Sequence, residues 1–285
     1  MVSLARYCCS TNADGDAECG FESVQSQNAV ALEHDDPAFP MLRTSVALSG
    51  RGMLDEEGNY YTGQWRGHKR HGLGMLIGSD GRKYEGSFQD DLAHGQGTFV
   101  ASNGNTYEGQ WVADKAHGHG KYVHQSAGST YEGNWVHDEQ SGKGTETWAD
   151  GTRYEGEFLR GRKHGTGSYS SLTGVRYEGL FSSDEMDGEG VYTFADGRVY
   201  SGQWAKSHMS GKGCMTWPNG SKYTGQYKAD RKHGQGTFLW PDGRTYVGQW
   251  MQGRQDGMGV LTDANGKASK GLWKAGERID GFEEE

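Results

Sequence analysis

Hydrophobic and polar positions alternate along most of this chain, in a unit that recurs about every 23 residues. Each unit opens on a tyrosine, with a glycine two residues later and a second large ring two residues after that. In Tyr84-Glu-Gly-Ser-Phe88, a period of two places both rings and the glycine on one face of a strand and the two polar side chains on the other. The pattern predicts β-strands with one aromatic face and one polar face.

The opening tyrosines follow one another at steps of 23 residues, apart from one step of 24 after the third. They are Tyr61, Tyr84, Tyr107, Tyr131, Tyr154, Tyr177, Tyr200, Tyr223 and Tyr246. Self-similarity at a fixed period is the signature of a repeat architecture, in which each unit packs only against its neighbours.

A second strand is predicted in each unit by runs such as Gly95-Gln-Gly-Thr-Phe99, where large rings are expected to lie over bare glycines. Between units, most junctions carry Asp-Gly or Asn-Gly, which favours type I′ turns with positive φ at both central positions. These dipeptides begin at Asp80, Asn103, Asp150, Asp196, Asn219, Asp242 and Asn265. The sequence therefore predicts an all-β fold: an elongated, single-layer antiparallel β-meander of about 20 strands, twisted into a rod.

Composition agrees with this class. Of the 285 residues, 48 are glycine and 4 are proline, and 9 Trp, 15 Tyr and 9 Phe supply the rings of a packed face. Without a Gly-X-Y triplet pattern, a collagen-like chain is excluded.

The net charge of −9 lies entirely outside the repeats. Residues 1–49 contribute −5 and residues 276–285 contribute −4, so residues 50–275 are neutral. Nucleic-acid binding depends on Lys and Arg neutralising phosphates, so nucleic acid is not expected as a partner. Proteins are the expected partners.

The chain divides into three predicted parts. Residues 1–49 have the composition of a disordered acidic tail. The array occupies 50–275, with an N-terminal half repeat at 50–60, nine repeats from Tyr61 to Ala268 and a C-terminal half repeat at 269–275. An acidic tail is predicted at 276–285.

The four cysteines form no disulfide framework, and neither a secretory signal nor a membrane span is apparent, so a reducing compartment is expected. Cys8 and Cys9 are candidates for S-acylation, and the alternative is two ordinary thiols in a flexible tail.

A histidine precedes the Gly-x-Gly pair in five units, at His71, His94, His117, His164 and His233. Successive copies would lie about 9–10 Å apart, two strands along the sheet, whereas two ligands of one zinc each lie about 2 Å from it. These histidines are expected to hydrogen-bond the neighbouring loop. No phosphate loop or nucleophile motif is present, so neither enzymatic activity, a metal nor a cofactor is expected.

Two sets of residues are candidates for binding. The first is the aromatic face, predicted to contact a partner: Tyr84, Phe88, Tyr107, Trp111, Tyr131, Trp135, Tyr154, Phe158, Tyr177, Phe181, Tyr200 and Trp204. The second comprises basic tips between the two strands of a unit, predicted to contact lipid or a partner: Lys69, Arg70, Arg162, Lys163, Arg231 and Lys232. Units with acidic connections lie between the basic ones, and the alternative is ordinary solvated tips of alternating sign.

The unit Tyr-x-Gly-x-(Trp/Phe)-x5-His-Gly-x-Gly, as in Tyr107 to Gly120, resembles the membrane occupation and recognition nexus (MORN) repeat. The resemblance implies a rod of β-hairpins that serves as a scaffolding module and is frequently dimeric. Family members include radial spoke head proteins of cilia, parasite cytoskeletal scaffolds, junctophilins and plant phosphatidylinositol-phosphate kinases, in which any enzymatic activity resides in another domain.

Two functions follow as expectations. The first is a non-catalytic protein scaffold in a cytoskeletal, ciliary or flagellar assembly of the radial-spoke kind, in the cytoplasm. The second is a peripheral membrane adaptor that binds acidic phospholipids through the basic tips and is tethered through the acylated tail. Incomplete repeats at both ends of the array leave unpaired strand edges, which predicts homodimers formed end to end.

Overall fold

The computed structural model describes residues 51–279, which contain strands and turns but no helix. The described residues divide into two compact units, here called the N-terminal unit (51–149) and the C-terminal unit (150–279). The strands of the N-terminal unit are β1 (Arg51–Leu54), β2 (Tyr60–Arg66), β3 (Lys69–Ile77), β4 (Lys83–Gln89), β5 (Leu92–Val100), β6 (Thr106–Val112), β7 (Lys115–His124), β8 (Ser129–Val136) and β9 (Glu139–Thr147).

The strands of the C-terminal unit are β10 (Arg153–Leu159), β11 (Arg162–Ser170), β12 (Arg176–Ser182), β13 (Glu185–Thr193), β14 (Val199–Ala205), β15 (His208–Thr216), β16 (Lys222–Lys228), β17 (Arg231–Leu239), β18 (Thr245–Met251), β19 (Arg254–Thr262), β20 (Ala268–Lys274) and β21 (Glu277–Ile279).

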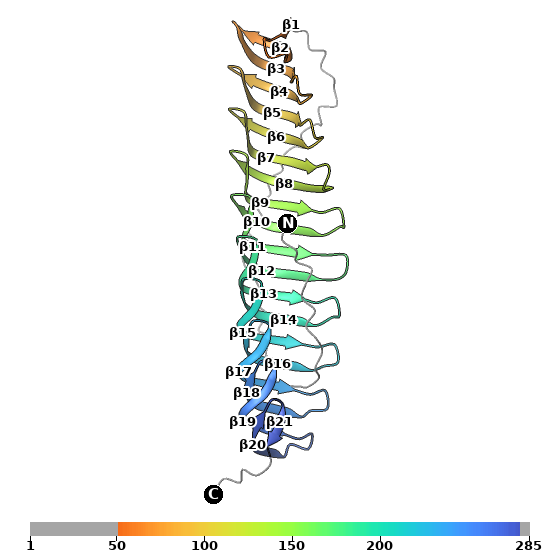
Figure 1. Cartoon of the computed structure of the whole chain (residues 1–285), viewed down its shortest axis with the longest axis vertical. Coiled ribbons are helices and arrows are strands. Elements are labelled where there is room, and N and C mark those ends of the chain that lie inside the picture. The colour runs from red at the N-terminus through yellow and green to blue at the C-terminus, as the bar shows by residue number, and fades with distance from the viewer. Residues whose placement is uncertain (1–50, 280–285) are drawn as a thin grey trace, which may run out of the picture. The chain divides into compact units, whose positions relative to one another are not determined.

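Within each unit every strand pairs antiparallel with the strands before and after it in the chain. Figure 1 shows the strands of each unit following one another in chain order, as a single layer of sheet. The prediction of an all-β antiparallel meander is confirmed.

The two glycines of each Gly-x-Gly pair serve different purposes, as β4 and β5 show. Gly86 pairs with Gly97 and Phe88 with Ala93, so three residues of β5 lie opposite Ser87 in a β-bulge. Gly95 stands in this bulge at a φ of 77°, a left-handed conformation that favours glycine. The second glycine, Gly97, has an ordinary φ and lies under the ring of Tyr84.

The turns between repeats differ from the prediction. The prediction of type I′ turns at Asp80-Gly81 and the equivalent dipeptides is wrong. Only the glycine has a positive φ there, 87° for Gly81. The Gly81 N–H donates to Gly78 O at 3.0 Å, and Asp80 Oδ1 accepts from the Arg82 N–H at 3.1 Å. The carboxylate thus holds its own turn in the manner of an Asx turn, and leaves the aspartate in its ordinary conformation.

The two-residue turns lie inside the repeats instead, where sequence indicated only a polar connection. Asp90 and Asp91 have φ values of 50° and 77°, and Ser183 and Asp184 have values of 51° and 73°, which is type I′ geometry without glycine. Residues other than glycine rarely adopt this backbone conformation, so other contacts must hold these turns in place.

Residues 1–50 and 280–285 lie outside the described residues, and with them lie Cys8 and Cys9. The disordered N-terminal tail therefore stays a prediction. Within the segment assigned to the acidic C-terminal tail, Glu277–Ile279 form β21 and pair with β20, which extends the sheet beyond the predicted half repeat.

Candidate protein-binding face

Each opening tyrosine lies flat over the glycines of its own hairpin. A Cβ placed on Gly156 or on Gly167 would lie 2.5 Å from the hydroxyl oxygen of Tyr154. That hydroxyl donates to the carbonyl oxygen of Glu157 at 3.0 Å, three residues along the chain. The glycine pair therefore forms a seat for the ring, and the hydrogen bond satisfies the one polar atom that the ring buries.

The tyrosines and the second rings of the repeats form a ladder of edge-to-face contacts. Tyr177 contacts Phe181 of its own strand at a centroid distance of 5.0 Å and Trp204 of the following repeat at 5.6 Å, with interplanar angles of 88° and 87°. The same pair of contacts recurs along both units, for example at Tyr84 and at Tyr223. Each ring thus couples one hairpin to the next.

The ladder is buried although the sheet has one layer. The twelve rings predicted to contact a partner have exposed fractions between 0 % and 8 %. They are core residues of their units, and their contact with a partner stays a prediction. Burial raises the pKa of Tyr107 and of Tyr246 to about 12, because the phenolate would have to form away from water.

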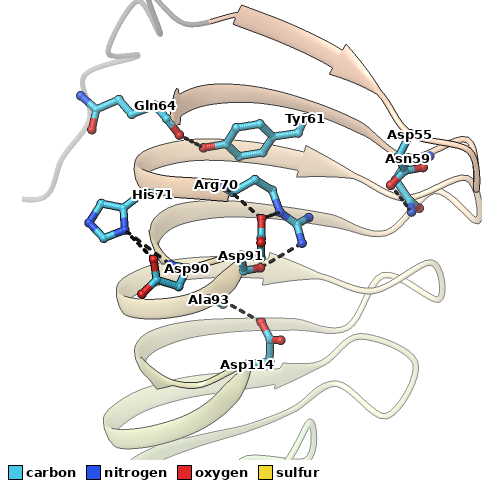
Figure 2. Close-up of polar contacts among 10 residues, drawn as sticks. All are labelled: Asp55, Asn59, Tyr61, Gln64, Arg70, His71, Asp90, Asp91, Ala93 and Asp114. Atoms are coloured by element: carbon cyan, nitrogen blue, oxygen red, sulfur yellow. Dashed lines mark hydrogen bonds and ion pairs between the residues drawn. The ribbon is translucent and has the colours of Figure 1, made fainter. Parts of the chain in front are cut away.

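A second contact couples the hairpins at their tips. Asp91 stands in the tip turn after β4, and its N–H donates to Arg70 O at 3.0 Å while its Oδ1 accepts from the Arg70 N–H at 2.8 Å. Figure 2 shows this pair, with the equivalent bond from the Ala93 N–H to Asp114 one repeat further on. The same reciprocal pair recurs at Asp184 and at Asp230, so these acids hold the left-handed tip turns in place.

The residue before the Gly-x-Gly pair takes part in the same contact at His71 and Asp187. His71 Nδ1 accepts from the Asp90 N–H at 3.4 Å, as Figure 2 shows, which confirms there the expected hydrogen bond to the neighbouring loop. In another repeat, Asp187 Oδ2 accepts a hydrogen bond from the Lys206 N–H at 3.2 Å. At His117 the prediction is wrong, because its buried Nδ1 has no hydrogen-bond partner among the described residues. Residues 51–279 contain no group of three His, Cys, Asp or Glu side chains placed to hold a metal ion.

The basic tips divide into two kinds. Lys69, Arg162 and Arg231, the first of each pair, are exposed. The second of each pair, namely Arg70, Lys163 and Lys232, turns onto the aromatic face instead. The Lys163 ammonium lies 5.2 Å from the centroid of the Tyr154 ring.

The exposed basic residues do not gather into one patch. Arg162 begins β11 and Arg231 begins β17, six strands apart, which corresponds to about 29 Å. Lys69 belongs to the other unit. Arg162 and Arg231 therefore lie at separate tips, and contact with lipid stays a prediction for all three residues.

The structure adds a row of rings that the sequence analysis did not single out. We call it the aromatic shelf, and it consists of Tyr192, Phe194, Trp217, Phe238 and Trp240. It lies beside the ladder in the C-terminal unit: Tyr192 contacts Trp204, and Phe238 stacks on Trp250 at 5.8 Å. The signal was in the sequence, since Phe194, Trp217 and Trp240 are spaced by the 23-residue period just before the Asp-Gly or Asn-Gly turns.

Three cations lie over the shelf. The Lys232 ammonium is 3.7 Å from the centroid of Phe238, and the guanidinium carbons of Arg198 and Arg244 are 4.7 Å and 4.6 Å from Phe194 and Trp240. Unlike the ladder rings, Tyr192, Phe194 and Trp217 are only half-buried. These three rings of the shelf are therefore the part of the aromatic face that a partner can reach, whereas Phe238 and Trp240 are buried.

This geometry defines a β-hairpin repeat protein whose neighbouring hairpins are joined by a buried aromatic ladder on one face and by hydrogen-bonded turns at the tips. The family model described as MORN repeat matches nine consecutive segments: 61–81, 84–106, 107–126, 131–153, 154–176, 177–197, 200–222, 223–243 and 246–268. The chain belongs to the MORN repeat family.

Other comparisons add only likenesses. The TCP10 domain of Danio rerio CPAP, solved in complex with a peptide of Danio rerio STIL, is 13 % identical, with a TM-score of 0.38 and coverage of 77 % of this chain and 96 % of that one. The TCP10c domain of Drosophila melanogaster Sas-4 is 13 % identical, with a TM-score of 0.30 and coverage of 71 % and 99 %. At these scores the likeness supports no inference about function. A search of curated proteins found no significant match.

Proposed function

We propose that this chain is a non-catalytic scaffold that binds protein partners in a cytoskeletal or ciliary assembly, of the kind to which radial spokes belong. The observation that carries the proposal is the uninterrupted run of nine MORN repeats over residues 61–268. MORN repeats form protein-binding or membrane-associated scaffolds.

The uses of the polar side chains support the same proposal. Asp91, Asp184 and His71, side chains of the kind that a catalytic site would draw on, instead hold the tip turns of neighbouring hairpins. The hydroxyls of ladder tyrosines such as Tyr84, Tyr177 and Tyr200 donate to carbonyl oxygens of their own strands. With residues 50–275 neutral overall, a long-range attraction to nucleic acid is absent as well.

A second candidate is a peripheral membrane adaptor, favoured by the exposure of Lys69, Arg162 and Arg231 at hairpin tips. Anionic lipid attracts each basic residue near its surface with only about 1 kcal/mol, so these three would need the help of acylation at Cys8 and Cys9. Residues 51–279 include no helix long and apolar enough to cross a bilayer.

One pair of measurements separates the two candidates. The tagged full chain is expected to co-sediment with the detergent-extracted cytoskeleton, and purified protein is expected not to float with vesicles that contain phosphoinositides. Flotation together with loss from the cytoskeletal pellet would favour the adaptor. A protein found in neither fraction would contradict both candidates.

We also propose that the array ends associate. Strand β1 pairs with β2 alone among the described residues, and it presents Met53 and Leu54 with exposed fractions of 49 % and 66 %. An unpaired strand with exposed apolar side chains can pair with an edge of a second copy. Light scattering at micromolar concentration is expected to give a mass above the 31.3 kDa of one chain, and a monomer would contradict the proposal.

A further inference from the structure

The aromatic shelf is the feature that repeat packing accounts for least. The ladder alone couples each hairpin to the next, through contacts such as Tyr200 with Trp204 and with Tyr227. The ladder continues through repeats that carry no ring at the corresponding loop position, which holds Gly78, Ala101 or Ser171 there. The three consecutive loop rings of the C-terminal unit are therefore additional to what the fold requires.

The shelf carries hydrogen-bond donors that the chain leaves unused. The ladder tryptophans donate their indole N–H groups to backbone carbonyls, as Trp204 does to Gly190 O and Trp250 to Gly236 O. Within residues 51–279, by contrast, neither the indole N–H of Trp217 nor the hydroxyl of Tyr192 has a hydrogen-bond partner, and the indole nitrogen of the buried Trp240 is also without one. Donors among half-buried rings suit a ligand that offers bare carbonyl oxygens.

The distance between equivalent rings of the shelf indicates which backbone conformation of a ligand would match it. Equivalent rings recur every two strands, which is about 9.6 Å along the sheet. One turn of a polyproline II helix is three residues of about 3.1 Å, or about 9.3 Å, whereas two turns of an α-helix take about 10.5 Å for seven residues. The mismatch is thus about 0.3 Å per repeat for polyproline II and about 0.9 Å for the α-helix. An added β-strand is excluded at this place, because the shelf lies on the face of the sheet and not at its edge.

The charges beside the shelf restrict further which class of ligand can bind there. The cationic groups of Arg198, Lys232 and Arg244 lie against the rings themselves. Asp196 and Asp242 pair with the two arginines and stand more than half exposed at the loop tips. The inner border of the shelf is therefore positive, and it complements acidic side chains that a ligand directs toward the rings.

We propose that the aromatic shelf of the C-terminal unit binds a proline-rich protein segment in the polyproline II conformation, with one acidic residue in each three-residue turn. Prolines of successive turns pack against Phe194 and Trp217, the two loop rings of the shelf that are only half-buried. The Trp217 N–H and the Tyr192 hydroxyl donate to the segment's carbonyls, which polyproline II leaves without internal hydrogen bonds. This inference rests on the proposed protein-binding function and names the class of partner.

The test uses the full chain and a fluorescein-labelled peptide of six Pro-Pro-Glu triplets, followed by fluorescence anisotropy. Three peptides serve as comparisons: six Gly-Ser-Glu triplets, which lack the helix; Pro-Pro-Pro-Glu repeats, which shift the phase; and Pro-Pro-Gln triplets, which lack the charge. The first two are expected to bind at least about tenfold more weakly than Pro-Pro-Glu, which is the size of effect that losing one well-packed contact produces. The uncharged peptide is expected to bind more weakly as well.

The variant Trp217→Ala is expected to weaken Pro-Pro-Glu binding at least about tenfold, and Phe194→Ala provides a second shelf variant in case the first does not fold. Trp148→Ala is the matched control, since Trp148 is half-buried at the same loop position but outside the shelf, and it should bind like wild type. Absence of binding, equal affinity for all four peptides, tighter binding of an amphipathic helical peptide, or equal losses in the shelf and control variants would overturn the inference. Co-sedimentation with the cytoskeleton would still test the proposed function separately.

Discussion

The ring of Tyr154 occupies the space into which a side chain on Gly167 would project. A Cβ there would lie 2.5 Å from the tyrosine Oη and 2.7 Å from its Cε2, closer than real Cβ contacts come. The two residues sit on neighbouring strands, β10 and β11, so the fit between ring and bare backbone fixes how the two strands of a hairpin meet. The relationship recurs in every MORN repeat of the chain, which explains why the unit retains both residues throughout.

Replacing the glycine tests this relationship directly. Gly167→Ala is expected to lower the free energy of unfolding by about 1–3 kcal/mol, because the methyl group overpacks the seat of a fully buried ring. Ser168→Ala, on the exposed face one residue on, is the matched control and should change stability by less than about 0.5 kcal/mol. Urea unfolding followed by tryptophan fluorescence measures both. Equal stabilities for the two variants would contradict the seat.

The tip contacts make a separate prediction. Asp184 Oδ1 accepts from the Lys163 N–H at 2.9 Å and holds a turn with a φ of 73°. Asp184→Ala removes the acceptor and is expected to cost about 1–3 kcal/mol of stability, since a half-buried N–H loses its partner. Asp184→Asn keeps an oxygen at that place and tolerates the left-handed conformation, so it should recover most of the loss. If alanine and asparagine behave alike in thermal unfolding, the tip bond contributes nothing.

Alkaline pH should loosen the ladder. Burial raises the pKa of Tyr107 and Tyr246 from the ordinary value of 10.0 to about 12, and it also raises the pKa of Tyr84 and Tyr177. Above the unfolded value, the unfolded chain gives up protons that the folded chain retains. The stability that these tyrosines contribute is therefore complete below about pH 10 and is lost as pH rises toward 12.

Urea unfolding at a series of pH values from about 8 to 12 tests this directly. The midpoint is expected to stay level up to about pH 10 and then to fall, with tyrosinate absorbance appearing as the protein unfolds. Tyrosinate that appeared near pH 10 in a protein that remained folded would show that the rings are open to water.

Much of this fold was accessible from the sequence because its elements depend on local periodicity. The spacing of Tyr84, Gly86 and Phe88 determined which face each side chain takes, and the pairing of Gly86 with Gly97 follows the same alternation. The turn types were not accessible in this way. Asp80-Gly81 has the dipeptide of a type I′ turn, but the Asp80 carboxylate folds back onto its own turn.

Type I′ turns without glycine, such as the one at Asp90 and Asp91, carry no local signal, because contacts between repeats hold them. Asp91 keeps its positive φ through bonds to Arg70, which lies 21 residues earlier in the chain. Similarly, the paired tip residues Arg231 and Lys232 look equivalent in sequence, yet the pleat of β17 leaves the first exposed and turns the second onto the rings. The packing of side chains against the rings therefore determines which residues of a repeat a partner can reach, and the sequence alone does not show it.

Removing one whole repeat tests most directly the claim that each hairpin is held by its neighbours through the ladder and the tips. Deletion of residues 177–199 would place Tyr200 where Tyr177 stands, next to the hairpin that contains Phe158. The product should be a folded protein with a wild-type circular dichroism spectrum per residue and cooperative thermal unfolding. Deletion of 177–188, about half a repeat, should abolish both. Equal spectra and melting for the two deletions, or loss of folding in the first, would contradict the account.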